Sequence, residues 1–512
     1  MQKNILHFWI LIFLPLWVFS QETPLEKSGF TSITSNEELT GYIKTLDELS
    51  DILSLEIIGA SVQNRPIYAL HFSKKDVGKD RSKLKVLFFA QQHGNEQSGK
   101  EGMLLLAKKL IQPEFSHLFN HIDLVLIPQV NPDGSEVNQR RNGHHVDLNR
   151  NHLIQTEPET QALHRLFDRY LFEVTMDVHE YSPYSESWEN FGYRKNSDVT
   201  LGSCTNINIS PTLRSFANEQ VLPNILNKLK RNGFSSFLYL PGGPPDKSYM
   251  RHSTFDINDG RQSLGIQNAL SFIQEGMNGT DMFLENIEHR AKGQMNGMLA
   301  MLELMYEQAS NIKKMVKSER KSMLSGLNSG TTSVQMIHRS DGTRLKLPVY
   351  SYDFAKDTIL VTDNFRPVVE SLKEVSNPIA YLIPCDDKNL VNWLENTGIA
   401  YEHFTKKKRV KYEAYYIGKI DSIDFEGDWV MDPSLAKQLI EVPDQAKYWY
   451  VPVRQLKAKM IIQALEPQSM LGLATYDLFA YLVKNNSVYP VLRVVKKGKN
   501  DPGSKNYYHS LN

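Results

Sequence analysis

Two polar segments that directly follow strand-like runs constrain the fold of this 512-residue chain more than any other feature. The apolar run 85–90 predicts a buried strand and 101–111 an amphipathic helix, which places His93-Gly94-Asn95-Glu96 on the turn between them. Another strand, predicted over 174–180, ends on Asp177-Val178-His179-Glu180. Strands that alternate with helices and carry polar side chains at their ends predict an α/β domain with its site at one edge of the sheet.

His93, Glu96 and His179 form a candidate metal-binding set. Positions i and i+3 of the turn face the same way, so the first two side chains can reach one ion together. Two histidines and a carboxylate give zinc three ligands and leave a fourth position for water, as in catalytic zinc sites. An isolated His-x-x-Glu pair is common in a chain of this length, so the argument depends on the third ligand. Asp177 shares a strand face with His179, either as a hydrogen-bond partner of that ligand or as a merely buried, paired aspartate.

Further motifs lie between these ligands. They are Asn131-Pro132-Asp133-Gly134, which follows a predicted strand over 124–128, and Arg140-Arg141-Asn142-Gly143-His144-His145-Val146-Asp147-Leu148-Asn149-Arg150-Asn151. In type and order they resemble the M14 family of zinc carboxypeptidases. Residues 58–68 are similar to that family's Ile-Gly-x-Ser-x-x-Gly-Arg-Pro-Ile strand pair, with Asn64 where glycine is usual. Asparagine tolerates a left-handed turn conformation nearly as well as glycine.

The resemblance implies roles for the matching residues. The three candidate ligands would bind one zinc ion per chain, and Asn149 with Arg150 would hold the C-terminal carboxylate of a peptide. Arg140 would polarise the scissile carbonyl, because a guanidinium offers a fixed charge to the developing oxyanion. Arg141 competes for that role, but Arg140 keeps the family's offset to the downstream motif. Tyr181 follows the third ligand at the family offset and is expected to line a substrate subsite.

The general base that the resemblance implies is Glu275, at the end of the strand-like run 268–274. It would take a proton from a zinc-activated water and pass it to the leaving amine. Glu285 and Glu288 compete for this role. They fall in the helix-like run 281–304, where charge is more simply explained as a solvated face.

The chain also departs from the family pattern. Asn95 stands where animal members commonly carry arginine, and His145 replaces a glycine, either as a cleft histidine or as a hydrogen-bonded loop residue. The tyrosine that closes over the substrate is not fixed by the sequence, although Tyr249 lies in the right stretch. Asp256 and Asp259 in the same stretch either favour basic C-terminal residues or cap loops.

The sequence thus predicts an exported zinc metallocarboxypeptidase that hydrolyses the C-terminal bond of peptides and proteins. Its expected fold is a mixed twisted α/β sheet flanked by helices, with an α+β C-terminal region. The alternative is a zinc amidase for N-acyl amino acids, because the succinylglutamate desuccinylase and aspartoacylase group also carries His-Gly-Asn-Glu, Asp-Leu-Asn-Arg and Asp-x-His. A binding protein on an inactive peptidase fold ranks last, since all ligand, base and carboxylate-binding residue types are present.

Charge and the N-terminal run bound the partners and the location. Lys+Arg and Asp+Glu both number 58, which gives no electrostatic case for nucleic-acid or anionic-membrane binding. Lys3, the apolar run 5–19 and Ser20 predict a cleavable signal peptide that is short for a membrane span; an uncleaved anchor is the alternative. We therefore expect export to a periplasm or outside the cell. Cys204 and Cys385 allow a disulfide but do not require one.

Four segments are expected: a signal peptide over 1–20, a catalytic domain over 31–306, a helical linker over 307–330 and an α+β region over 331–512. The last of these resembles the C-terminal extension of some exported bacterial members of the family, notably at Leu465-Glu466-Pro467-Gln468-Ser469-Met470-Leu471-Gly472-Leu473. Its role stays open between substrate positioning, binding and stabilisation.

Overall fold

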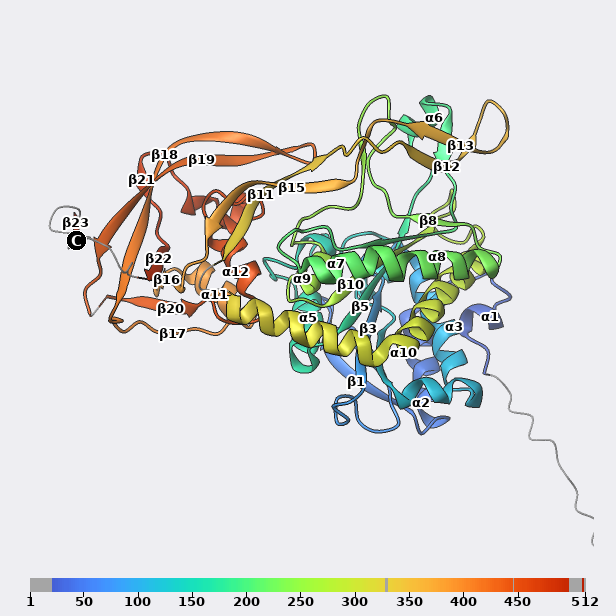
Figure 1. Ribbon diagram of the computed structural model, residues 1–512. Coiled ribbons are helices and arrows are strands. Elements are labelled where there is room, and N and C mark those ends of the chain that lie inside the picture. The colour runs from blue at the N-terminus through green and yellow to red at the C-terminus, as the bar shows by residue number, and fades with distance from the viewer. Residues whose placement is uncertain (1–20, 327–329, 445, 497–508, 511–512) are drawn as a thin grey trace, which may run out of the picture.

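A mixed eight-stranded sheet forms the centre of the first half of the chain (Figure 1). The computed structural model describes residues 21–326, 330–444, 446–496 and 509–510, so the expected signal peptide lies outside the described residues. The strands run, in sheet order, β1 (Leu53–Ala60), β2 (Pro66–Phe72), β4 (Ile122–Ile127), β3 (Leu84–Ala90), β5 (Val174–Tyr181), β10 (Leu270–Met277), β7 (Val199–Ser203) and β8 (Ser236–Leu238). Strands β4, β3, β5 and β10 are mutually parallel. Strand β2 pairs antiparallel with β1 and β4, and β7 is antiparallel to β10 but parallel to β8.

Helices cover both faces of this sheet because its central strands are apolar on both sides. In β3, Phe88 packs into a cluster with helices α2 (Asn36–Glu48), α3 (Gln97–Leu110), α8 (Leu222–Arg231) and α10 (Ile287–Gly326). Its neighbour Phe89 packs into a second cluster with α5 (Pro158–Tyr170) and α9 (Gly260–Gly265). Adjacent strand residues point to opposite faces, so the two clusters are the two faces of one sheet. The expected α/β fold class is confirmed.

Two local expectations are met and one boundary differs. The runs 85–90 and 174–180 lie in β3 and β5, and Asn64 adopts a left-handed φ of 61° in the turn between β1 and β2. The sequence predicts that the catalytic domain ends near Tyr306 with a helical linker after it, whereas one continuous helix, α10, spans that boundary to Gly326. Its second half keeps Ala309, Ile312 and Val316 in the core beside the sheet, so the stretch expected to be a linker packs as part of the catalytic fold.

The C-terminal region is built around a second sheet. Its strands run, in order, β17 (Glu402–His403), β20 (Tyr448–Pro452), β16 (Ala380–Pro384), β22 (Leu492–Lys496), β18 (Val410–Phe425), β19 (Asp428–Glu441) and β23 (His509–Ser510), with β21 (Ser487–Val488) beside β18. Helices α11 (Lys388–Asn396) and α12 (Ala458–Leu465) pack against it. The mixture of strands and helices is the expected α+β type.

The two halves of the chain share strands and core. Strand β12 (Leu345–Ser351) joins β13 (Lys356–Thr362) to β6 (Tyr193–Lys195), and β14 (Phe365–Arg366) pairs with β9 (Met250–Arg251). One hydrophobic cluster contains residues from both halves, and the indole of Trp393 donates a hydrogen bond to the carbonyl of Leu153 at 2.9 Å. Among the helices of the described residues, none has the length and apolar character needed to cross a membrane.

A buried acid, Glu466, lies in the Leu465–Leu473 motif. Glu466, at the end of α12, accepts hydrogen bonds from the hydroxyls of Tyr381 at 2.6 Å and Tyr415 at 2.8 Å. It also forms an ion pair with Arg493 of β22 at 2.9 Å, and both charged side chains are 1% exposed. A buried charge that keeps its partners is tolerated, whereas removal of one partner leaves the other uncompensated.

We expect Glu466→Leu to lower the free energy of unfolding by about 3–5 kcal/mol, because the buried Arg493 guanidinium loses its most enclosed partner. The measurement is urea denaturation followed by fluorescence. Asp363→Ala is the control: it removes an ion pair with Arg344 in which both side chains are more than half exposed, and should cost about 1 kcal/mol or less. Equal losses in the two variants would contradict the role of Glu466.

Candidate metal centre and active-site cleft

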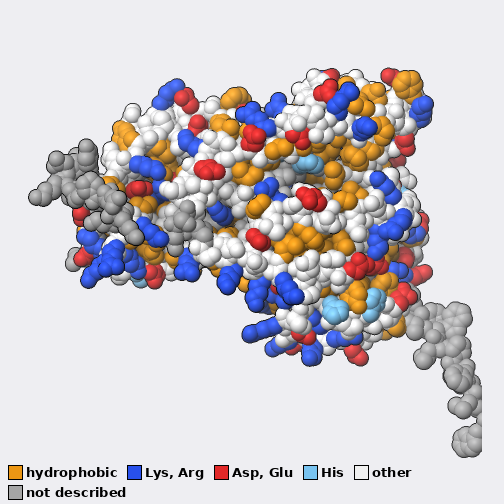
Figure 2. Space-filling view, viewed as in Figure 1, with side chains coloured by type: hydrophobic (Ala, Val, Ile, Leu, Met, Phe, Trp, Pro, Cys, Tyr) orange, Lys and Arg blue, Asp and Glu red, His pale blue; other side chains and the backbone are white. Residues whose placement is uncertain are grey.

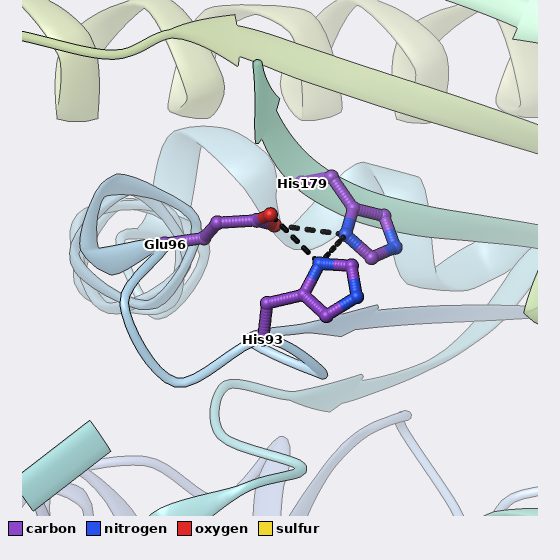
Figure 3. A group of neighbouring side chains, drawn as sticks. All are labelled: His93, Glu96 and His179. Carbon is purple, nitrogen blue, oxygen red and sulfur yellow. Dashed lines mark hydrogen bonds and ion pairs between the residues drawn. The ribbon is translucent and has the colours of Figure 1, made fainter. Parts of the chain in front are cut away.

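His93, Glu96 and His179 converge on one point (Figure 3). His93 lies on the turn after β3, Glu96 precedes the first residue of α3, and His179 projects from β5. The Nδ1 atoms of the two histidines are 3.2 Å apart, and the Glu96 carboxylate lies 2.7 Å from one and 2.8 Å from the other. All three side chains are buried, so the turn and the strand hold the donor atoms with little freedom to move apart.

The outer nitrogen of each histidine faces a further carboxylate. Nε2 of His93 lies 3.0 Å from Asp147, and Nε2 of His179 lies 2.8 Å from Asp177. A carboxylate that accepts the Nε2 proton leaves Nδ1 with its lone pair directed at the common point. Behind them a buried chain continues, since Gln92 donates to Asp177 at 2.8 Å and contacts the ring of His152 at 2.6 Å.

The donor chemistry fits a divalent cation. Two imidazole nitrogens and a carboxylate oxygen are borderline and hard ligands of the kind that zinc binds, and their ligand atoms lie within 4.8 Å of one another. Burial raises the pKa of Glu96, but His93 and His179 outweigh it and hold the pKa well below the usual range. Burial lowers the pKa of His93, yet Glu96 and Asp147 raise it overall.

A glycine fixes the approach of the first motif to the loop after β4. A Cβ atom on Gly94 would lie 2.1 Å from the carbonyl carbon of Gly134 and 2.4 Å from the nitrogen of Ser135. Both are backbone atoms, so a side chain at this position would force the two loops apart. The Gly94 nitrogen also donates to the carbonyl of Arg140 at 3.2 Å. The first motif and the Asn131–Gly134 motif are thus locked together, which sets the distance between the metal centre and the Arg140 loop.

The three residues open into a cleft of about 610 Å³, a volume typical of sites for small ligands. Glu275 of β10 lies in this cleft and is in register with His179 of the parallel strand β5, so both side chains leave the same face of the sheet. Burial, reinforced by the charge of Glu96 and opposed by the histidines, raises the pKa of Glu275 to about 7. Glu285 and Glu288 do not line the cleft; they bind Thr280 and Lys292.

Arg140 and Arg150 also line the cleft. Arg140 is held by Asp147 at 3.0 Å and lies 3.6 Å from Glu96, whereas Arg141 donates to the carbonyl of His145 and does not line the cleft. The Arg150 guanidinium donates to its neighbour's carbonyl at 2.7 Å and stays exposed to solvent.

Asn149, beside Arg150, is buried and already engaged. Its side-chain oxygen accepts from the nitrogen of Gly260 at 2.7 Å, and its amide nitrogen lies 3.4 Å from the ring of His179. It therefore ties the Arg150 loop to both α9 and the metal centre.

Of the two tyrosines considered from the sequence, Tyr181 lines the cleft and Tyr249 does not. The ring of Tyr181 lines the cleft, but its hydroxyl is occupied by Ser197, donating to the carbonyl at 2.6 Å and accepting from the nitrogen at 3.1 Å. Tyr249 does not line the cleft; Arg366 stacks on its ring at 4.1 Å. Tyr239, which the sequence analysis did not single out, lies in the cleft wall.

The two aspartates of the 246–265 stretch play different parts. Asp259 lines the cleft too, but it caps α9 by accepting from Gln262 and pairs with Arg261 at 3.3 Å. Asp256 lines the cleft beside Arg150, whose positive charge acts on its carboxylate. Burial raises the pKa of Asp256 to about 6. His145 is exposed and left-handed, with φ 62°, and lies outside the cleft.

Comparison with known proteins identifies the domain that holds the candidate ligands. Residues 39–221 match the family model Peptidase_M14, described as zinc carboxypeptidase. This chain carries an M14 zinc carboxypeptidase domain. Carboxypeptidase 2 of Trichophyton tonsurans is 23% identical over 91% of this chain and 87% of its own length, and carboxypeptidase D of Mus musculus is 25% identical over 48% of this chain and 20% of its own. A metallo-carboxypeptidase of Pseudomonas aeruginosa, solved with (2-guanidinoethylmercapto)succinic acid, covers 53% of this chain and 69% of its own at 22% identity, with a TM-score of 0.42.

The chain is therefore an enzyme of the metallocarboxypeptidase class. The match to the family model includes the three candidate ligands and the Arg140–Asn151 motif but ends before Glu275. The fungal relatives extend over nearly the whole chain, including the C-terminal region.

We expect His93→Ala and His179→Ala each to abolish stoichiometric zinc binding, because two remaining ligands cannot replace a buried three-residue set. Zinc per chain is measured by elemental analysis after dialysis. His144→Ala is the matched control, since this histidine contacts Glu157 and lies outside the cleft. A native protein that contains no zinc would contradict the site.

Proposed function

We propose that this enzyme removes the C-terminal residue of peptides at the cleft that His93, Glu96 and His179 line. The observation that carries the proposal is the position of Glu275, in register with His179 on the adjacent parallel strand and in the same cleft as Arg150. That arrangement supplies a base, a metal-binding set and a cation for the substrate carboxylate within one small volume. Zinc, when bound by the three ligands, polarises the scissile carbonyl and makes water a better nucleophile.

Glu275 acts as the general base and then as the general acid. A pKa of about 7 lets its carboxylate accept the proton of the attacking water near neutral pH and release it to the leaving amine. The side chain lines the cleft and is buried, so little bulk water competes for the proton. Its strand fixes the backbone on both sides, since β10 pairs with β5 and β7 at this position.

Arg140 and Arg150 interact with two different negative charges, the oxyanion and the terminal carboxylate of the substrate. Arg140 lies beside the metal centre and is oriented by Asp147, a position from which it stabilises the oxyanion. Arg150 is exposed in the cleft and holds the terminal carboxylate with its planar fork. Asn149, held by Gly260, positions this loop and presents its amide beside it. Tyr181 contributes the face of its ring to the cleft wall.

Glu275→Gln should leave zinc content unchanged and lower kcat by about 100- to 10,000-fold, because the amide cannot accept the proton. Steady-state hydrolysis of a blocked dipeptide, with zinc measured on the same sample, checks this. Glu288→Gln is the control outside the cleft. Near-normal turnover of the zinc-loaded Glu275→Gln variant would refute the role.

Arg150→Ala should lower kcat/KM for free-acid peptides by at least about 30-fold, which corresponds to about 2 kcal/mol, and Arg150→Lys should restore little. Arg141→Ala, on the same loop but outside the cleft, is the control. Amidation of the peptide C terminus should abolish cleavage by the wild-type enzyme. Equal cleavage of free-acid and amidated peptides would contradict carboxypeptidase action whatever the state of the zinc site.

A second candidate function is hydrolysis of N-acyl amino acids. Two observations favour it: Asn95 removes a positive charge from the first motif, and Asp177 pairs with the ligand His179 in the Asp-x-His pattern of those amidases. Peptides and N-acyl amino acids assayed side by side separate the two, and activity on the acyl amino acids alone would favour the second. Export is part of the same proposal and depends on residues 1–20; a mature N terminus at Gln21 in a secreted fraction would support it.

A further inference from the structure

The C-terminal region forms one wall of the catalytic cleft. The long hairpin of β18 and β19 extends from the second sheet towards the catalytic domain (Figure 1). The cleft residues that this region supplies come from the hairpin tip and from the segment after α12: Phe425, Glu426, Asp428, Val430, Met470, Thr475 and Tyr476. The same cleft contains the metal-binding set and Glu275, so the wall belongs to the proposed reaction site and not to a separate pocket.

Glu426 clamps the hairpin tip in place. Its carboxylate lies 3.1 Å from Arg251 and 2.9 Å from the ring of His338, and its side chain is only 10% exposed. The turn itself is tight, with left-handed φ values of 55° at Glu426 and 106° at Gly427, as two-residue hairpin loops require. Phe425 packs on Phe255 at 5.5 Å between ring centres. The tip is therefore anchored by charge and by apolar contact.

Tyr476 brings the wall to the carboxylate-binding side of the cleft. Its ring is partly buried and lines the cleft together with Asp256, Arg150 and Asn258. Asn258 in turn donates to the carbonyl of Arg150 and accepts from the nitrogen of Leu153. A substrate whose terminal carboxylate reaches Arg150 thus has the side chain of its last residue close to Tyr476.

We propose that the C-terminal region completes the substrate cleft of this enzyme and that Tyr476 is a specificity-determining residue for the side chain of the substrate's last residue. The proposal rests on the carboxypeptidase function proposed above. Tyr476 offers an aromatic face, and the carboxylate of Asp256 lines the same side of the cleft. A ring and a carboxylate together receive a cation well, so lysine and arginine are the expected C-terminal residues.

The test compares peptides that differ only in a C-terminal Lys, Leu or Glu. Wild-type kcat/KM is expected to be highest for Lys, and Tyr476→Ala to reduce the Lys-to-Leu ratio by about tenfold or more, the scale on which pocket contacts discriminate. Tyr481→Ala is the matched control, because that tyrosine is partly exposed and binds Asp387 away from the cleft. Unchanged ratios in zinc-loaded Tyr476→Ala would overturn the role of Tyr476, and equal wild-type rates on Lys and Leu would overturn the basic preference.

A second measurement does not depend on activity. Glu426→Gln should speed amide hydrogen exchange of residues 423–430 and 251–255 together, because both ends of the clamp are released. Trp429→Ala, on the same hairpin with a 72% exposed side chain, should leave exchange of 251–255 unchanged. Unaltered exchange in Glu426→Gln would overturn the wall. If the wild-type protein cleaves none of the peptides, the proposed function fails, and exchange still decides whether the wall exists.

Discussion

The parallel pairing of β3, β5 and β10 is the constraint on which the site depends. His93 and Glu96 follow the end of β3, His179 lies near the end of β5, and Glu275 stands beside it on β10. Parallel strands bring their carboxyl ends to the same edge of a sheet, so residues nearly two hundred positions apart meet without any long-range loop having to reach across. A shift of one residue in β5 or β10 would turn His179 or Glu275 to the opposite face, and the cleft would lose that group.

Because side chains alternate along β5, its charged residues point to opposite faces of the sheet. Asp177 and His179 point to the metal centre, whereas Glu180 points the other way and pairs with the buried Arg290 of α10 at 2.8 Å. Buried ions are costly unless each has a partner, and here every charged residue of 177–180 has one. Arg290 of helix α10 thus compensates the buried acid that follows His179 on β5. The surface also mixes the two signs of charge: acidic and basic side chains are interspersed over most of the face shown in Figure 2.

The sequence predicts what local chemistry and strand periodicity determine. Asn64 and His145 both stand where the resemblance expects glycine, and both adopt left-handed φ values, which shows why glycine suits those turns. The strands, the turn carrying the first motif and the alternation of Asp177 with His179 follow from patterns a few residues long. Tyr239, Arg251 and Tyr476 could not be found this way, because they enter the cleft through packing between segments with no motif of their own. The sequence predicts a helix for the second half of α10 but not its packing: the strong charge of this stretch favours a linker, whereas Ala309, Ile312 and Val316 lie in the core.

The two halves of the chain depend on each other at the loop that carries Arg150. Trp393, fully buried in α11, donates to the carbonyl of Leu153, and Asn258 bonds both the nitrogen of Leu153 and the carbonyl of Arg150. Leu153 itself lies in the core cluster that also contains the apolar residues of α12. Buried backbone groups need partners, and here the C-terminal region supplies one for the segment that follows the carboxylate-binding motif. The position of the Arg150 guanidinium is thus set partly by residues more than two hundred positions further along the chain, so the C-terminal region acts on the cleft through this loop as well as through its wall.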